Sequence, residues 1–237
     1  GLGDVYKRQV ISFVVIPLSF YLREKPTEIR PTPTDIKNNL QITKIAISGR
    51  QLQLFLGLAG VGCCIAMAMP QVHIVAYCVG LGFGPAIGAE MLSLMLACGV
   101  ISRITFGVCA DRLGGFYTLI LSSTLQMLSL FLFLPFNGMV SLYVVSAIFG
   151  LSQGGIVPSY TIVVREFLPA HEAGQRIGIV LMLTIFGMAI GGWMSGWIFD
   201  QTGSYQIAFL NGILWNVFNL AILVWLFIRM RKGYATV

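Results

Sequence analysis

The residues best suited to chemistry in this chain are the few ionisable side chains that interrupt long apolar stretches. Arg103 stands eight residues before Asp111, at the end of one such stretch. On a helix rising 1.5 Å per residue, this spacing puts Arg103 about 12 Å inside the helix end. In a membrane an arginine costs at least about 2.5 kcal/mol on insertion scales, so it should face a cavity or a partner. Its planar group can hold a carboxylate through two parallel hydrogen bonds.

Two other interpretations of Arg103 stay open at this point. The side chain could extend along the helix to the lipid headgroups. It could also pair with an acid supplied by another part of the protein. An anion-binding site is predicted only if Arg103 contacts a substrate, and not by either of these two alternatives.

His73 and Glu90 are the candidates for binding a coupled proton. His73 follows Pro70 by three residues, and a kink there would free a backbone carbonyl and turn the ring toward a cavity. An imidazole can accept a proton or bond a carboxylate. A neighbouring helix could equally satisfy His73, and Glu90 could be an interfacial charge. Further candidates for lining a substrate cavity, each also explained by packing, are Tyr77, Phe149, Gln153 and Tyr160.

Charged residues at the ends of apolar stretches are candidates for gating. We expect Asp111 to accept hydrogen bonds from a neighbouring helix N-terminus, and the arginines to pair with acids across a gap. Such contacts hold one face of a protein closed and break when it opens, although Arg165 and Arg176 could instead anchor to headgroups. The gating candidates are Gly107, Asp111, Arg112, Gly114, Arg165, Glu166, Arg176 and Asp200.

Enzymatic motifs are weak in this sequence. Gly150-Leu-Ser152-Gln-Gly154 has the spacing of a nucleophile elbow, but that motif needs a strand-to-helix turn and here falls inside an apolar stretch. An intramembrane hydrolase using Ser152 and His73 is the alternative function from a different class. His171-Glu172 lacks the second histidine of a zinc site, and the five cysteines lie in apolar stretches. We therefore expect no bound metal, no cofactor and no disulfide framework, and we do not expect the protein to be an enzyme.

The composition requires these residues to be positioned by membrane-spanning helices. Hydrophobic residues make up 57% of the 237 residues and charged residues only 10%, whereas soluble domains average about 45–50% apolar and about 25% charged. The net charge of +6 comes from basic residues beside apolar spans, which indicates orientation in a membrane and not binding of nucleic acid. The chain is predicted to be an all-α integral membrane protein.

Six apolar spans, each about 20 residues or longer, can cross the hydrocarbon region. Before them, 10–22 is too short to span and is predicted to be the end of an earlier helix, helix six. We expect 1–9 to be a non-native or assembly remnant, and 23–50 to be a polar linker before the six-helix part at 51–237. The spans are predicted at 52–79, 87–109, 116–135, 139–163, 177–198 and 206–228.

The distribution of basic residues predicts the orientation of the spans. Six crossings put the linker and the C-terminus on one side, and that side receives all twelve basic residues of the linker, the connections and the C-terminus. The opposite connections, near 80–86, 135–138 and 199–205, receive none. By the positive-inside rule, the linker and the C-terminus are predicted to lie in the cytoplasm, in a multi-pass protein of the cell membrane.

A Gly-x-x-x-Asp-x-x-Gly motif occurs twice, 89 residues apart. The first copy runs from Gly107 to Gly114, and the second from Gly196 to Gly203. At an offset of 88, Pro70 aligns with Pro158. Because three crossings separate the copies, they should lie at opposite membrane faces. This pattern predicts a 3+3 inverted repeat, which is typical of secondary transporters.

The segment from Arg103 to Gly115, with its Gly-x-x-x-Asp-Arg-x-Gly loop, resembles the major facilitator superfamily. Pro70 with Tyr77, the Leu-Ser stretch after Met91 and the Gly-Gly after Gln153 are similar to its monocarboxylate-porter and oxalate/formate-antiporter branch. The resemblance implies the C-terminal half of a twelve-helix carrier that moves a small organic anion, a monocarboxylate, by alternating access and needs an N-terminal six-helix half. Symport and antiport both stay open, with a proton as the candidate coupling ion. Gly99, where many such porters have Asp, departs from the pattern, and a carrier of non-carboxylate substrates is the alternative within the family.

Overall fold

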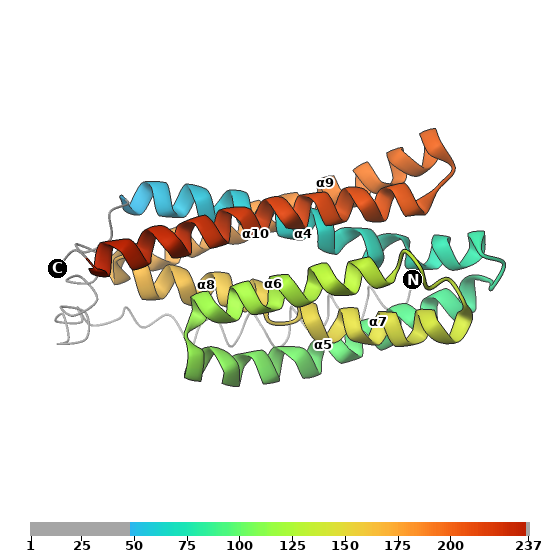
Figure 1. The fold of residues 1–237 in the computed structure, drawn as a ribbon, viewed down its shortest axis with the longest axis horizontal. Helices are drawn as coiled ribbons and strands as arrows, with labels where there is room; N and C mark the ends of the chain where they lie inside the picture. Colours follow the sequence, from blue (N-terminus) through green and yellow to red (C-terminus); the bar gives the residue numbers. More distant parts are fainter. Residues whose placement is uncertain (1–47, 236–237) are drawn as a thin grey trace, which may run out of the picture. The chain divides into compact units, whose positions relative to one another are not determined.

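The computed structural model describes residues 48–235, which are helical apart from short connections (Figure 1). The predictions for 1–9, 10–22 and nearly all of 23–50 lie outside the described residues. The helices are α4 (Gly49–Gly80), α5 (Pro85–Leu113), α6 (Gly115–Leu132), α7 (Met139–Gln153), α8 (Ile156–Phe167), the short 3-10 turn η2 (Ala170–Glu172), α9 (Ala173–Thr202) and α10 (Tyr205–Ala235).

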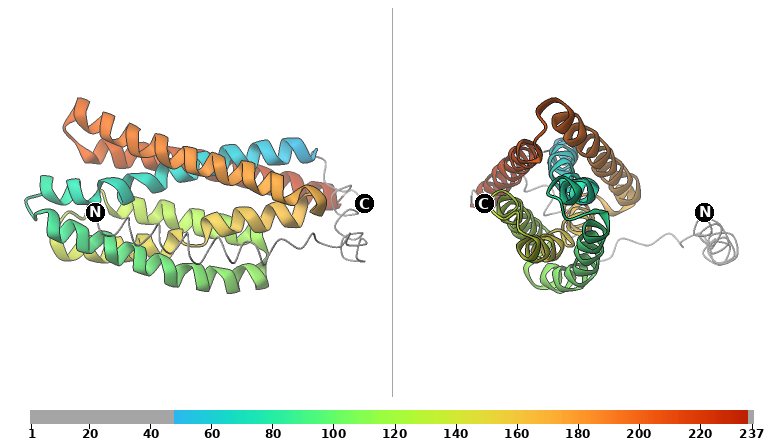
Figure 2. Two further views of the ribbon diagram at one scale, coloured as in Figure 1. Left: turned by 180° about the vertical axis from the view of Figure 1, so that it is seen from behind. Right: turned by 90° about the vertical axis from the view of Figure 1, so that its right-hand side faces the viewer.

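Six spans in this part of the chain are long and apolar enough to cross a membrane, which confirms the predicted all-α architecture. Successive spans run in opposite directions, as both side views show (Figures 1 and 2). Ser48, Gly114 and the α8–α9 connection therefore lie at one end of the bundle, called here the Ser48 end. The connections before α5, α7 and α10 lie at the other end, called the Gly203 end. The assignment of the Ser48 end to the cytoplasm stays a prediction.

The packing of the helices follows the predicted internal repeat. The first span, α4, packs on α9, α10 and α5, and the fourth span, α7 with α8, packs on α5, α6 and α9. Exchanging the first three spans with the last three turns one set of partners into the other. Gly114 and Gly203 each follow the last residue of their helix with a positive φ, of 86° and 65°, a conformation that glycine adopts without strain. They lie at opposite ends of the bundle, as the repeat predicts.

Glycines allow two pairs of helices to approach at backbone distance. A Cβ atom on Gly191 of α9 would lie 2.5 Å from the carbonyl oxygen of Ile65 in α4. A Cβ atom on Gly154, just after α7, would lie 2.5 Å from the carbonyl oxygen of Gly99 in α5. Small residues serve helix packing in membranes because lipid provides no hydrophobic force between helices.

The fourth span is broken in its middle, so the predicted continuous helix over 139–163 is wrong there. Helix α7 ends at Gln153, Gly154 and Gly155 form a turn, and α8 begins at Ile156. Pro158 would crowd the carbonyl four residues earlier, that of Gly154. The Ser102 hydroxyl of α5 donates to the Leu151 carbonyl at 2.6 Å, the acceptor that a continuous helix would offer to the Gly155 N–H.

Candidate functional site

Arg103 borders a cavity of about 220 Å³ between α4, α5 and the broken fourth span. We call it the Arg103 cavity. Its walls are mostly apolar, with three long polar or charged side chains among them. The lining residues are Met67, Gln71, Leu96, Gly99, Val100, Arg103, Gln153, Gly154 and Val157.

Arg103 is exposed on α5, and its guanidinium has no ion pair or hydrogen bond among residues 48–235. Gly99 lies one helical turn before Arg103 on α5, so no side chain from that turn fills the space beside Arg103. The structural ion pair that sequence reasoning left open therefore has no partner within the described part. Both the geometry and the free charge suit the binding of an anion.

Gln71 is a polar cavity residue that the sequence analysis missed. Its Nε2 donates to Oε1 of Gln153 at 2.7 Å, which joins α4 to the end of α7. Gln153, predicted to line a cavity, does so and is buried. An uncharged polar residue directly after Pro70, inside an apolar span, was the signal that could have identified Gln71.

The break in the fourth span opens toward the same cavity, since Gly154 in the turn and Val157 in the first turn of α8 both line it. Within residues 48–235, the N–H groups of Gly154 and Gly155 have no backbone acceptor. Irregular backbone is tolerated at membrane depth where it lines a wet cavity, because water or a ligand can satisfy it. The N-terminus of α8 also adds positive potential here.

The structure does not bring His73 to the Arg103 cavity. Its Nε2 lies 2.9 Å from the carbonyl oxygen of Gly192 in α9, and its ring packs 5.7 Å from that of Tyr205. The other protonatable candidate, Glu90, accepts a hydrogen bond from the Tyr143 hydroxyl at 2.5 Å. Glu90 is exposed and is likewise not among the cavity-lining residues.

Three predicted cavity residues lie away from the Arg103 cavity. Tyr77 packs edge-on against Phe209, and Phe149 is completely buried. Tyr160, also completely buried, donates its hydroxyl to Oδ1 of Asn219 at 3.0 Å. None of the three lines the Arg103 cavity, so their predicted contact with a substrate is not supported by their position.

The hydrolase alternative is wrong. The Ser152 hydroxyl donates to the Phe149 carbonyl at 2.8 Å and lies 3.1 Å from the hydroxyl of Ser129. His73, the base that this alternative requires, is bonded to α9. The serine and the histidine are thus engaged with different helices and do not form a nucleophile–base pair.

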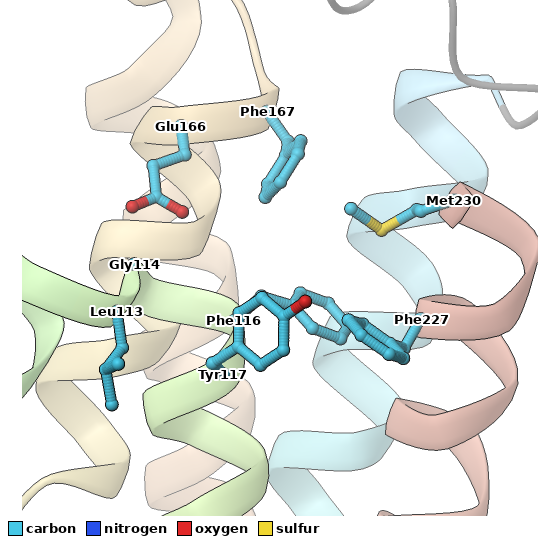
Figure 3. A pocket seen from close by; sticks show the side chains of 8 residues that line it. All are labelled: Leu113, Gly114, Phe116, Tyr117, Glu166, Phe167, Phe227 and Met230. Atoms are coloured by element: carbon cyan, nitrogen blue, oxygen red, sulfur yellow. The ribbon is translucent and has the colours of Figure 1, made fainter. Parts of the chain in front are cut away.

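Glu166, and not Asp111, caps a helix at the Ser48 end. Its Oε1 accepts a hydrogen bond from the N–H of Gly115, the first residue of α6, at 3.0 Å. Asp111 makes no such hydrogen bond within residues 48–235, so its expected contact with a helix N-terminus stays a prediction. Figure 3 shows Glu166 at the edge of an aromatic pocket of about 300 Å³ with Phe116 and Phe227. The remaining charged gating candidates, which are exposed and have no ion pair within residues 48–235, are Asp111, Arg112, Arg165 and Asp200.

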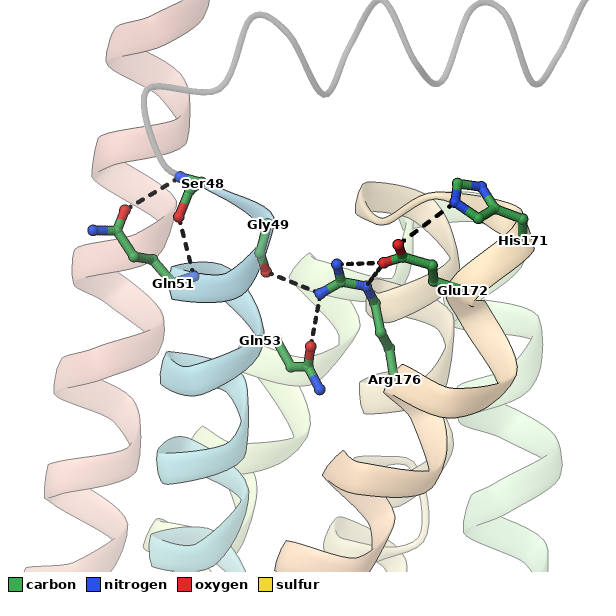
Figure 4. A network of polar contacts seen from close by, with 7 residues as sticks. All are labelled: Ser48, Gly49, Gln51, Gln53, His171, Glu172 and Arg176. Atoms are coloured by element: carbon green, nitrogen blue, oxygen red, sulfur yellow. Dashed lines mark hydrogen bonds and ion pairs between the residues drawn. The ribbon is translucent and has the colours of Figure 1, made fainter.

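Arg176 ties α9 to the start of α4 (Figure 4). Its Nε donates to Glu172 at 2.7 Å, and a terminal nitrogen donates to the Gln53 side chain at 2.7 Å and to the Gly49 carbonyl at 3.5 Å. The hydrogen bond from Arg176, and then its charge, lower the pKa of Glu172 below its usual value. Next to this network, Ser48 and Gln51 form a capping box at the N-terminus of α4.

The sequence is similar to a known family of proteins and to several of its members. The sequence model of the Major Facilitator Superfamily matches residues 10–179 and 54–236. The chain is 28% identical to monocarboxylate transporter 13 of Rattus norvegicus over 172 residues, covering 72% of this chain and 40% of that protein. It is 30% identical to a gallate transporter of Pseudomonas putida over 133 residues, covering 56% and 28%.

A crystal structure of the peptide transporter POT in complex with sulfate has a similar fold. Its TM-score is 0.65 at 17% sequence identity, and the match covers 73% of this chain and 37% of that one. The chain therefore spans less than half the length of these three proteins.

Proposed function

Because the chain belongs to the major facilitator superfamily, we propose that it forms one six-helix half of a secondary transporter for small organic anions, which bind in the Arg103 cavity. We further propose that the substrate is a monocarboxylate. A second six-helix half, preceding this one, completes the substrate path. The carrier resides in the cell membrane, with the Ser48 end in the cytoplasm.

The observation that carries this proposal is the free guanidinium of Arg103 beside a cavity within the membrane span. An unneutralised cation at this depth is costly unless a wet cavity or a ligand compensates it. A carboxylate compensates the charge and matches the fork geometry. The names of two relatives, a monocarboxylate transporter and a gallate transporter, agree with an anionic substrate.

Alternating access requires contacts that form and break at the ends of the helices. We assign this role at the Ser48 end to the Glu166–Gly115 bond and to the bonds of Arg176 with Glu172 and Gln53. At the other end, Glu90 with Tyr143 joins α5 to α7. Glu90 is our candidate for binding a coupled proton, because His73 is already bonded to α9.

The test is uptake of radiolabelled propionate and lactate by cells expressing the complete carrier. Arg103→Lys keeps the charge but loses the two-pronged geometry, and should weaken uptake substantially. Arg103→Gln should abolish uptake while abundance and the melting temperature in detergent stay normal. The control Arg229→Gln removes an exposed arginine outside the cavity, near the end of α10, and should leave uptake unchanged. Full uptake by Arg103→Gln at normal abundance would overturn the anion-binding role.

A further inference from the structure

The Arg103 cavity holds a second polar element besides the arginine. The amides of Gln71 and Gln153 come from different helices and meet through one hydrogen bond of 2.7 Å. Neither side chain has another hydrogen bond within the described residues. Whichever amide donates, a single bond between two amides leaves one carbonyl oxygen and three N–H groups without partners.

These unpaired groups are costly unless something in the cavity satisfies them. Gln153 is only 6% exposed, yet its amide nitrogen is not fully enclosed by protein. A molecule in the cavity can therefore make the hydrogen bonds that the protein leaves unmade. The neighbouring N–H groups of Gly154 and Gly155 add two more donors without backbone acceptors. Besides the arginine, the residues at this cavity thus offer several donors and one acceptor.

Resting on the proposed function, we propose that Gln71 and Gln153 determine specificity by reading a hydroxyl group on the substrate. A hydroxyl is the small group that both donates, here to the free amide oxygen, and accepts, here from a free amide N–H. Arg103 holds the carboxylate, and the amide pair selects hydroxylated acids over unsubstituted acids of the same size.

The spacing of the two anchors suits a short acid. Gly99 precedes Arg103 by four residues, about 6 Å along the helix. A Cβ atom on Gly99 would lie 4.0 Å from Nε2 of Gln153 and 3.8 Å from the Gly150 carbonyl. The bare backbone of Gly99 therefore leaves the space between guanidinium and amide pair open, and a methyl group there would narrow it without a clash.

The experiment compares two pairs of acids that differ by one hydroxyl, lactate with propionate and 4-hydroxybenzoate with benzoate, in the complete carrier. The unaltered protein should prefer the hydroxylated member of at least one pair. Gln71→Met keeps the length of the side chain without its amide, and should lower this preference roughly tenfold, the worth of one hydrogen bond. Uptake of the unsubstituted acid should change little.

Two further variants keep the inference falsifiable. Gly99→Ala should fold normally but reduce uptake of the hydroxylated acid more than that of the plain acid. Gln126→Met removes a buried glutamine that bonds Cys63 away from the cavity; it should lower the melting temperature without changing the preference.

Equal uptake of both acids by the unaltered carrier, or an unchanged preference in Gln71→Met, would overturn the role of the amide pair and leave the proposed function standing. A parallel loss of both acids in Gln71→Met would also overturn it, because that pattern indicates a structural glutamine. Failure of the unaltered carrier to take up any of the four acids would instead count against the proposed function itself.

Discussion

Two spans of this bundle carry a proline at aligned positions, yet only one of them breaks. Helix α4 continues through Pro70 from Gly49 to Gly80, whereas the span that contains Pro158 divides into α7 and α8. Four residues with side chains, 66–69, precede Pro70, but Gly154 and Gly155 stand in the turn before Pro158. A proline alone therefore does not interrupt a helix here.

What divides the fourth span is a combination of three features. The two glycines have little helix propensity. Gly154 lies against the α5 backbone at Gly99, and Gly155 lies against the Phe106 side chain of α5. Ser102 also supplies the Leu151 carbonyl with another donor. In α4 the Gln126 amide of α6 likewise donates to the Cys63 carbonyl, at 3.3 Å, yet α4 stays continuous. Such a donor therefore interrupts a span only together with the other two features. The difference places irregular backbone beside the Arg103 cavity and a continuous helix opposite it.

The largest effect should come from filling the close approach at the break. Gly154→Ala places a Cβ atom 2.5 Å from the Gly99 carbonyl oxygen and 2.6 Å from Cβ of Ser102, so the backbones must separate. We expect a loss of about 1–3 kcal/mol in stability, as for other overpacked sites, measured as a lower melting temperature in detergent. Gly107→Ala on α5, where a Cβ atom meets nothing within 4 Å, is the control and should not destabilise. A normal melting temperature for Gly154→Ala would show that the close approach is not needed.

Replacing each proline should have unequal consequences. Pro70→Ala restores a missing backbone hydrogen bond in a helix that is already continuous, and should slow amide exchange around Ala66 and Pro70. Pro158→Ala leaves the glycines and the Ser102–Leu151 bond in place, so the amides at Gly154 and Gly155 should still exchange fast. Hydrogen–deuterium exchange with mass spectrometry measures both. Strong protection at Gly155 in Pro158→Ala would assign the break to the proline alone. Combining Ser102→Ala with Pro158→Ala should slow amide exchange at Gly154 and Gly155, so that the fourth span exchanges more like α4.

The smallest effect concerns how the two spans begin. Helix α4 starts with the Ser48 cap and the bonds of Arg176, whereas α7 starts at Gly138 without a side-chain cap. Because the pKa of Glu172 is lowered by Arg176, their ion pair stabilises the fold above the usual carboxyl pKa of about 4.3. This contribution is lost as the pH falls through the lowered pKa.

The melting temperatures of the unaltered protein and of Arg176→Gln should therefore differ most near neutral pH and converge in part below about pH 4. Convergence is incomplete because the bonds of Arg176 to Gln53 and Gly49 do not depend on the charge of Glu172. Salt should weaken the effect, since the Glu172 side chain is partly exposed. A difference that stays constant with pH would show that the ion pair does not contribute.

Most of the architecture was predictable from the sequence because the membrane imposes a length and a polarity on every span. The alternation of directions, the glycines after α5 and α9 and the position of Arg103 inside a span followed from charge counts and spacing. The break at Gly154 was not predictable in the same way, because it depends on a hydroxyl from a different helix. For the same reason Gln71 and Gln153 became a pair only in three dimensions, and His73, distinctive in sequence, proved to be bonded to α9.

The contact between α9 and α4 through Gly187 and Gly191 also has a mechanical meaning. At these positions a Cβ atom would lie within 3 Å of the carbonyl oxygens of Val61 and Ile65, so no side chain separates the two backbones. Side chains between two helices can accommodate a displacement by changing rotamer, but two backbones in direct contact cannot adjust in this way. Helices α4 and α9 should therefore move together as one rigid body. A displacement at the Arg176 end should then produce an equal displacement at the opposite end of the pair.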